Sequence, residues 1–199
     1  MHPNPLFRTE DRDLMEALVD QIGFGMVFLA TPDGPRVAHT PLLSTGDGAV
    51  QFHLARGNAL TRHLEGATAL VTVNGPDAYV SPRWYAERDS VPTWDYVALE
   101  LEGRVRRLAD EGLEAFLHAL IEKHENCLGE ARWQAQEATT STWNTLFRGI
   151  VGFEMEVRAW RPTLKLSQKR STEERGTIAA GLAASGSPAL AQLMGQLVP

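Results

Sequence analysis

The chain has 199 residues, of which 43% are apolar and 22% are charged. These fractions are typical of soluble globular proteins and disfavour a disordered chain. A single core can grow to this length, so we expect one domain. The formal net charge is -6. Because proteins bind nucleic-acid phosphates mainly through many lysines and arginines, this charge disfavours direct DNA binding.

Cysteine usage and the length of the apolar runs indicate a cytoplasmic protein. Cys127 is the one cysteine in the sequence, so it has no partner for an intramolecular disulfide. The N-terminal segment MHPNPLFRTEDRDL carries acidic residues where a signal peptide needs an apolar run. The apolar stretch at 25–30 is too short to cross a bilayer. We therefore expect no membrane association.

The first element predicted is an amphipathic helix. Leu14, Leu18 and Ile22 recur at helical spacing, Thr9 is a candidate N-cap, and Gly23 is placed to end the helix. One face of this helix should therefore pack inward.

Four strands are predicted next, at 26–31, 37–43, 49–55 and 67–73. The turn sequence at 32–35 joins the first two in a hairpin, where Gly34 permits a positive φ. Before the fourth strand, Asn58 is placed to cap a short helix that ends at Leu64. Short hairpin turns of this kind indicate antiparallel pairing.

The second half predicts three more strand segments, at 78–81, 94–108 and 150–160. One helix is predicted from the cap Asp110 and another from Thr142. The capping-box pattern that begins at Ser171 and the Ser187-Pro188 pair predict two helices in the tail. We expect a mainly β protein with α-helices, in which residues 1–170 form a small antiparallel barrel and residues 171–199 a helical appendage of the same domain.

Strong catalytic motifs are not found in the sequence, which has no phosphate-binding loop, dinucleotide fingerprint, paired CxxC or HExxH. His118, Glu122 and Glu125 follow one another at helical spacing and could share a metal. A solvated charged helix face is the commoner meaning of this pattern, so no metal site is predicted.

The segment 81–96 is rich in aromatic residues and prolines, with two Trp and two Tyr. It fits either a proline-braced cap of the barrel or a stacking wall for a planar ligand. Residues alone leave these two readings open.

Two further segments have a structural and a functional reading. In 53–58, Arg56 and the helix N-terminus at Asn58 could hold a phosphate, although an ordinary capped turn explains the same residues. In 165–170, the alternation of cations with Ser167 and Gln168 suits an anionic or carbonyl-rich ligand, although it also fits a solvated basic connector. The residues of each segment leave both readings open.

Taken together, these segments resemble the PaiB family of FMN-binding negative transcriptional regulators. The resemblance runs through 1–7, 53–58, 75–85, 91–96, 149–153 and 165–168. It implies an FMN-binding split barrel of six antiparallel strands that forms a homodimer, with a flavin in a cleft between the subunits. Departures occur at Asp95 and Lys169, where the family commonly has Asn, and a carboxylate cannot donate a hydrogen bond as an amide does.

We expect the phosphate of FMN near Arg56 and Asn58, and the ring near 39–41 and the aromatic loop. Lys165 could approach the pyrimidine edge of the flavin and stabilise negative charge there. The residues predicted to contact the cofactor are His39, Thr40, Pro41, His53, Arg56, Asn58, Ser81, Trp84, Tyr85, Thr93, Trp94, Lys165 and Gln168.

The leading functional hypothesis is a flavin-dependent or metabolite sensor that regulates transcription negatively through a partner protein, since no helix-turn-helix signature is found. The main alternative is an NAD(P)H-dependent flavin reductase or oxidase with His39 or His53 as acid or base, although single histidines on strands are more often structural. Two further alternatives are a haem-binding split barrel and a dimeric scaffold without a ligand.

Overall fold

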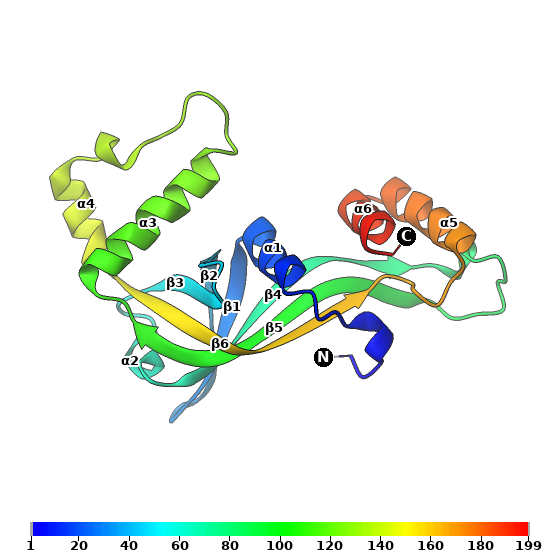
Figure 1. The fold of residues 1–199 in the computed structure, drawn as a ribbon, viewed down its shortest axis with the longest axis horizontal. Helices are drawn as coiled ribbons and strands as arrows, with labels where there is room; N and C mark the ends of the chain where they lie inside the picture. Colours follow the sequence, from blue (N-terminus) through cyan, green and yellow to red (C-terminus); the bar gives the residue numbers. More distant parts are fainter. Residues whose placement is uncertain (1, 199) are drawn as a thin grey trace. The chain divides into compact units, whose positions relative to one another are not determined.

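The computed structural model describes residues 2–198, and its six strands close into a barrel in the order β1-β2-β3-β6-β5-β4 (Figure 1). The strands are β1 (Phe24–Thr31), β2 (Gly34–Ser44), β3 (Ala49–Ala55), β4 (Thr68–Val80), β5 (Thr93–Arg107) and β6 (Ile150–Lys165). Antiparallel pairing joins β1 to β2, β1 to β4, β2 to β3 and β3 to β6. The mainly β antiparallel barrel expected from the sequence is confirmed.

Helices come before, between and after the strands along the chain (Figure 1). The α-helices are α1 (Arg12–Ile22), α2 (Thr61–Leu64), α3 (Asp110–Glu125), α4 (Thr140–Phe147), α5 (Thr172–Ala184) and α6 (Pro188–Leu197), and the short 3-10 helices are η1 (Pro5–Phe7), η2 (Pro82–Trp84) and η3 (Ala135–Glu137). Among the described residues, no helix has the length and apolar character needed to cross a membrane.

The first hairpin forms as predicted. Thr31 pairs with Gly34, so Pro32 and Asp33 make a two-residue turn, and Gly34 has a φ of +98°. Only glycine adopts this backbone conformation at little cost. Gly23, with a φ of +64°, ends α1 as the sequence indicated.

Alternation along the strands builds the core. On β3, Val50, Phe52 and Leu54 are buried, and the rings of Phe52 and Phe153 stack with centroids 5.5 Å apart. A second cluster forms where Leu113, Phe116 and Leu120 of α3 pack with Leu108, which precedes the helix. These are the positions at which helical and strand periodicities place apolar side chains on one face.

The contacts divide the chain into two compact units. Unit 1 comprises residues 1–15, 73–100 and 161–199, and unit 2 comprises residues 16–72 and 101–160. Strands β4, β5 and β6 contribute residues to both units. In unit 1, α5 and α6 pack against each other as a helical pair (Figure 1).

Two strands are longer than the sequence indicated. The separate strands expected at 67–73 and 78–81 form one continuous strand, β4, and β6 continues past 160 to Lys165. In β4, a Cβ added at Gly75 would lie only 3.0 Å from Cβ of Val97. The absence of a side chain at Gly75 therefore lets β4 pass close to Val97, a contact that local sequence does not reveal.

Four predicted helix starts were wrong by one to three residues. The Asp11 side chain, and not Thr9, caps α1, because its Oδ1 accepts from Leu14 N at 3.0 Å. Helix α2 begins only at Thr61, and Asn58 instead accepts from Leu60 N at 2.9 Å within the preceding turn. Asp110 is the first residue of α3 and its cap position is Ala109, because the backbone there is extended. Helix α4 begins at Thr140, after the cap Thr139 and two residues before the expected Thr142.

The close approach of β5 and β6 at Gly103 gives a test of the barrel. An added Cβ there would overlap the backbone oxygen of Glu156, and a backbone atom cannot move aside as a side chain can. We expect Gly103→Ala to lower the free energy of unfolding by about 2–3 kcal/mol. Gly57→Ala is the matched control, because its added Cβ meets nothing within 4 Å. Urea unfolding of both variants should separate them, and equal stability would contradict this packing.

Candidate functional site

The first residues of β5 line two different hollows of unit 1, one on each face of the strand. Successive side chains of a strand point to opposite faces, so Thr93 and Asp95 lie on one face of β5 and Trp94 and Tyr96 on the other. Asp95 is buried, at 1% exposure, whereas Trp94 is 56% exposed. Each face lines its own hollow.

The hollow on the Trp94 face, which we call the aromatic hollow, has a volume of about 800 Å³. Its aromatic walls are Tyr79, Trp84 and Trp94. The rings of Tyr79 and Trp94 meet edge to face, with centroids 6.5 Å apart, and both side chains are about half exposed. One ring of this exposed pair can stack against a planar ligand in a hollow of this size, and the other then meets the ligand edge-on.

Trp84 belongs both to the aromatic hollow and to the docking of the C-terminal helices. A Cβ added at Gly181 of α5 would collide with the indole ring of Trp84. The indole therefore lies directly against the helix backbone at Gly181. Two residues that follow α5, Ser185 and Ser187, also line the aromatic hollow, so the helical pair forms one of its walls.

Arg83 supplies a cation at the aromatic hollow. Within residues 2–198 its guanidinium forms no hydrogen bond or ion pair, and the residue is exposed. Ser81, which also lines this hollow, accepts from Arg83 N at 3.3 Å and so caps η2. A guanidinium of this kind is suited to a phosphate or a carboxylate, which it can bind through two parallel hydrogen bonds.

The hollow on the Asp95 face, which we call the cationic pocket, has a volume of about 370 Å³. Its centre is Lys165, whose Nζ donates to Thr93 Oγ1 at 2.5 Å and to the carbonyl oxygen of Trp94. The same Nζ lies 3.4 Å from Asp95 Oδ1, and the Lys165 side chain is 15% exposed. Its ammonium is therefore bonded on three sides by groups of the chain itself.

A tight turn after β6 completes the cationic pocket. Ser167 has a φ of +56°, which is unusual for a residue other than glycine, and its hydroxyl donates to Asp95 Oδ2 at 2.5 Å. Gln168 closes the turn, because its Oε1 accepts from Leu166 N at 2.8 Å and its Nε2 donates to the Leu164 carbonyl. The buried carboxylate thus holds a strained residue in place.

Tyr85 and Arg170 form the opposite wall of the cationic pocket. The Arg170 guanidinium carbon lies 3.7 Å from the centroid of the Tyr85 ring, and Arg170 also bonds Ser90 Oγ at 3.1 Å. Burial raises the pKa of Tyr85, an effect that the charge of Arg170 partly offsets. Tyr85 is therefore a packed wall and not an exposed stacking surface.

Six of the residues predicted from the sequence belong to unit 2. The Arg56 guanidinium donates two hydrogen bonds to backbone carbonyls. Its Nε lies 2.9 Å from Arg148 O, and its Nη2 lies 3.1 Å from Ile150 O. Asn58 uses its side chain in the turn described above. A four-residue α2 also has little helix dipole to offer a phosphate.

The remaining predicted residues of unit 2 lie on β2 and β3. Thr40 is buried and donates to the His53 carbonyl oxygen at 2.6 Å, whereas His39 is exposed on the opposite face of β2, which Pro41 shares. His53 has a buried Nδ1 without a hydrogen-bond partner and lies 5.8 Å from the Phe116 ring. Burial lowers the pKa of His53, which favours its neutral form.

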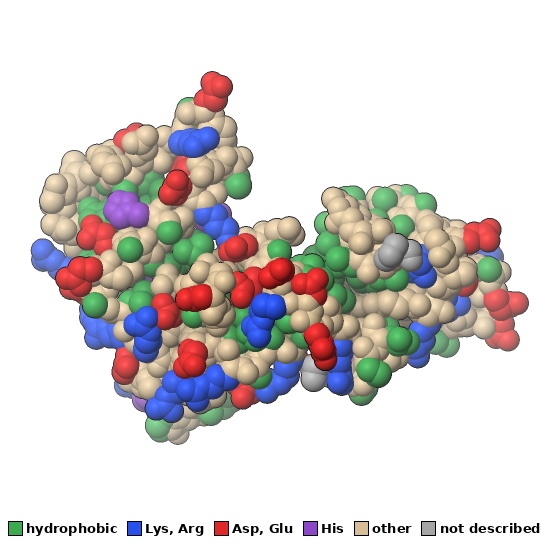
Figure 2. All heavy atoms as spheres, in the orientation of Figure 1, with side chains coloured by type: hydrophobic (Ala, Val, Ile, Leu, Met, Phe, Trp, Pro, Cys, Tyr) green, Lys and Arg blue, Asp and Glu red, His purple; other side chains and the backbone are tan. Residues whose placement is uncertain are grey.

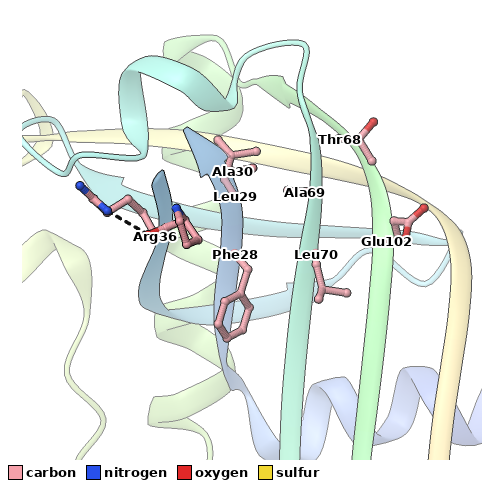
Figure 3. A pocket seen from close by; sticks show the side chains of 9 residues that line it. Phe28, Leu29, Ala30, Arg36, Thr68, Ala69, Leu70 and Glu102 are labelled. Atoms are coloured by element: carbon pink, nitrogen blue, oxygen red, sulfur yellow. Dashed lines mark hydrogen bonds between the residues drawn. The ribbon is translucent and has the colours of Figure 1, made fainter. Parts of the chain in front are cut away.

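Unit 2 has two hollows of its own, and neither contains any of the predicted cofactor residues. One, of about 280 Å³, lies across β1 and β4, where Phe28 and Leu70 extend to the same side and Arg36 donates to Pro35 O (Figure 3). Another, of about 310 Å³, includes His118 and Glu122, and the His118 ring stacks on Trp143 at 5.3 Å. No group of three metal-ligating side chains is found among residues 2–198.

Comparison with known proteins assigns the chain to a family. Residues 1–159 match the family described as "Putative FMN-binding domain". The chain belongs to this FMN-binding family. The turn at 165–170 and the helices α5 and α6 follow the matched residues.

Among curated relatives of this FMN-binding chain, the "Protease synthase and sporulation protein PAI 2" of Bacillus subtilis is 30% identical over 170 residues. The alignment covers 83% of this chain and 81% of the relative. The resemblance to the PaiB family is therefore confirmed.

Solved structures share the fold. The FAD and heme binding protein from Mycobacterium smegmatis superposes with a TM-score of 0.62 at 22% identity, over 87% of this chain and 79% of that protein. The flavocytochrome Anf3 from Azotobacter vinelandii gives a TM-score of 0.59 at 19% identity, over 82% of this chain and 72% of that protein. At these identities the likeness shows the fold alone.

The described residues of this FMN-binding chain fit a flavin at the aromatic hollow. Two exposed aromatic rings face a volume of about 800 Å³, and Arg83 offers an unpaired guanidinium there. The prediction from the sequence did not include four residues that line this hollow, namely Tyr79, Arg83, Ser185 and Ser187. Arg83 lies inside the 81–85 motif and could have been found there, whereas the two serines carry no local signal.

Asp95 gives a pH-dependent test of the cationic pocket. Burial raises the pKa of the Asp95 carboxyl, and the Ser167 hydrogen bond and the Lys165 charge lower it only in part. The folded state therefore binds this proton more tightly than the unfolded state, so the contribution of Asp95 to stability increases as the pH falls, until about pH 3.9, the ordinary Asp pKa.

Asp95→Asn removes this titration and leaves the other ionisable groups in place. We expect the Tm of the unaltered protein minus that of Asp95→Asn to increase as the pH falls from about 7 to about 4.5. Thermal unfolding followed by circular dichroism at several pH values measures this difference. A constant or falling difference would contradict the assignment.

Proposed function

We propose that the chain binds FMN in the aromatic hollow and acts as a flavin-dependent sensor, which passes the state of this hollow to a partner protein through α5 and α6. The observation that carries the proposal is the position of Trp84, which lines the hollow and packs on Gly181 of α5. A ligand that displaces this indole must also disturb the helix, since interiors are packed too densely to absorb the movement.

Different residues of the aromatic hollow would contact the ring and the phosphate of FMN. Trp94 would stack against the isoalloxazine ring, Tyr79 would border that ring edge-on, and Arg83 would bind the phosphate. Bound FMN would supply a redox-active flavin, and the aromatic walls would shield one face of it from water. Ser185 and Ser187 would offer hydroxyls from the segment between α5 and α6. The ligand would therefore contact both the aromatic hollow and the helical pair, the two parts that the proposed relay connects.

A homodimer, with the flavin in a cleft between subunits, is part of the same proposal. An exposed apolar face on the β1–β2 hairpin supports it. Phe24 is 51% and Val37 45% exposed, and Pro41 pairs directly with Phe24. His39 shares this face of β2. Contacts from His39, Pro41 or the 53–58 segment to the flavin belong to this proposed dimer.

We also propose that the chain regulates transcription negatively through a partner protein and not by binding DNA directly. The name of the Bacillus subtilis relative links that protein to protease synthesis and sporulation. On the face drawn in Figure 2, basic and acidic side chains are interspersed, which does not suit the tracking of a phosphate backbone. Salt-dependent binding of a promoter fragment by the purified protein would overturn the indirect mode of action.

Trp94→Ala tests the location of the flavin. We expect FMN to bind at least fivefold more weakly, because loss of one aromatic stacking partner costs about 1–3 kcal/mol. Trp133→Ala is the matched control, since Trp133 is also partly exposed but lies in unit 2 and outside the aromatic hollow. Quenching of flavin fluorescence on titration with each protein measures the affinity.

A second control separates the phosphate from the ring. Arg83→Gln should weaken binding of FMN but leave binding of riboflavin, which has no phosphate, unchanged. Equal FMN affinity in all three variants would remove the flavin from this hollow. Sustained oxidation of NADPH by the FMN-loaded protein would instead favour a flavin-dependent oxidoreductase.

Gly181→Ala tests the relay from the hollow to the helices. The added methyl group displaces Trp84, so FMN should no longer alter hydrogen exchange of the α5 amides, whereas it should do so in the unaltered protein. Gly176→Ala lies in the same helix and its added Cβ meets nothing within 4 Å, so it should keep the response. A response to FMN that is equal in both variants would contradict the relay.

A further inference from the structure

The cationic pocket is not used by the proposed flavin site. We propose that it binds a small organic monocarboxylate, a second ligand that the chain recognises independently of FMN. Its lining comes from one compact unit, through the loop 85–92, the start of β5 and the turn 165–170.

The charges of the cationic pocket favour a ligand with one negative charge. Lys165 is paired with Asp95, and Arg170 lies 3.4 Å from Glu174 Oε1. Lys169 lines the pocket without a hydrogen bond or ion pair among the described residues. One cation thus remains uncompensated. A phosphate monoester carries about -1.5 to -2 charges at neutral pH, so a monocarboxylate matches this single charge better.

A hydroxyl group that shares the cationic pocket with Lys169 can complete the binding of a carboxylate. Ser90 and Thr93 both line this pocket. The Thr93 hydroxyl accepts from Lys165 and donates to the carbonyl oxygen of Trp94 at 3.5 Å. The Ser90 hydroxyl accepts from Arg170, which leaves its own hydrogen available to donate. The bond from Arg170 orients this donor before any ligand arrives, which lowers the entropy cost of binding.

Apolar side chains in the lining favour an organic acid over an inorganic anion. Phe7 and Val91 line the cationic pocket, and so does Tyr85, which has Arg170 over its ring. Val91 is 76% exposed, so an apolar ligand would remove much of its surface from water. A volume of about 370 Å³ admits a ring or short chain carrying one carboxylate.

The two ligand sites are separated by the β5 backbone. Trp94 faces the aromatic hollow, whereas Thr93 and Asp95 face the cationic pocket. One ligand in the aromatic hollow therefore does not contact Lys169 across the strand. This separation allows the carboxylate site to be tested with and without FMN, so a failure of one proposal leaves the other measurable.

Benzoate is the probe for this test, and benzamide is its neutral control of nearly the same shape. We expect calorimetry to detect benzoate binding to the purified full chain, and benzamide to bind at least tenfold more weakly. Lys169→Gln should weaken benzoate binding at least tenfold. Arg158→Gln removes one exposed cation from unit 2 and should leave the affinity unchanged.

Asp95→Asn provides a variant with the opposite expected effect. It removes a negative charge from the pocket wall and keeps an oxygen that can accept from Ser167, so benzoate should bind more tightly than to the unaltered protein. Equal affinity for benzoate and benzamide, or tighter binding of inorganic phosphate than benzoate, would overturn the proposal. Displacement of benzoate by FMN but not by riboflavin would assign the pocket to the flavin phosphate instead.

Discussion

The alternation of side chains at the start of β5 governs both candidate sites. Trp94 and Asp95 are neighbours in sequence, yet one is half exposed in an aromatic hollow and the other is buried beside an ammonium group. The geometry of an extended strand requires this separation. Two chemically different surfaces, one for stacking and one for an anion, can therefore be built from a few consecutive residues without interfering with each other.

The buried carboxylate of Asp95 accounts for the shape of the turn that follows β6. Asp95 accepts from Ser167 and lies beside Lys165, and these two interactions span about seventy residues of sequence. A buried ion pair contributes little net stability, because desolvation of both charges offsets their attraction. The effect of Asp95 here is to position the chain. Its carboxylate holds Ser167 in a left-handed backbone conformation, and the turn then leads to Lys169 and α5.

The C-terminal helices are part of the candidate site and not only an appendage. Trp84 lies on Gly181, and the segment between α5 and α6 lines the aromatic hollow. Because the indole occupies the space that a side chain at Gly181 would fill, η2 and α5 pack directly against each other.

The sequence by itself determined most strand positions, the first hairpin and the family, because side-chain alternation, turn chemistry and short motifs are local properties. It divided β4 in two and ended β6 too early. It also identified the aromatic loop and the turn at 165–170 as unusual. Only the tertiary structure decided which residues face a common hollow. It bonded Arg56 to the carbonyls of Arg148 and Ile150, placed Trp84 on Gly181 and left Arg83 unpaired among residues 2–198. These contacts join residues about 90 to 100 positions apart, and no local periodicity encodes which distant backbone or side chain will meet them.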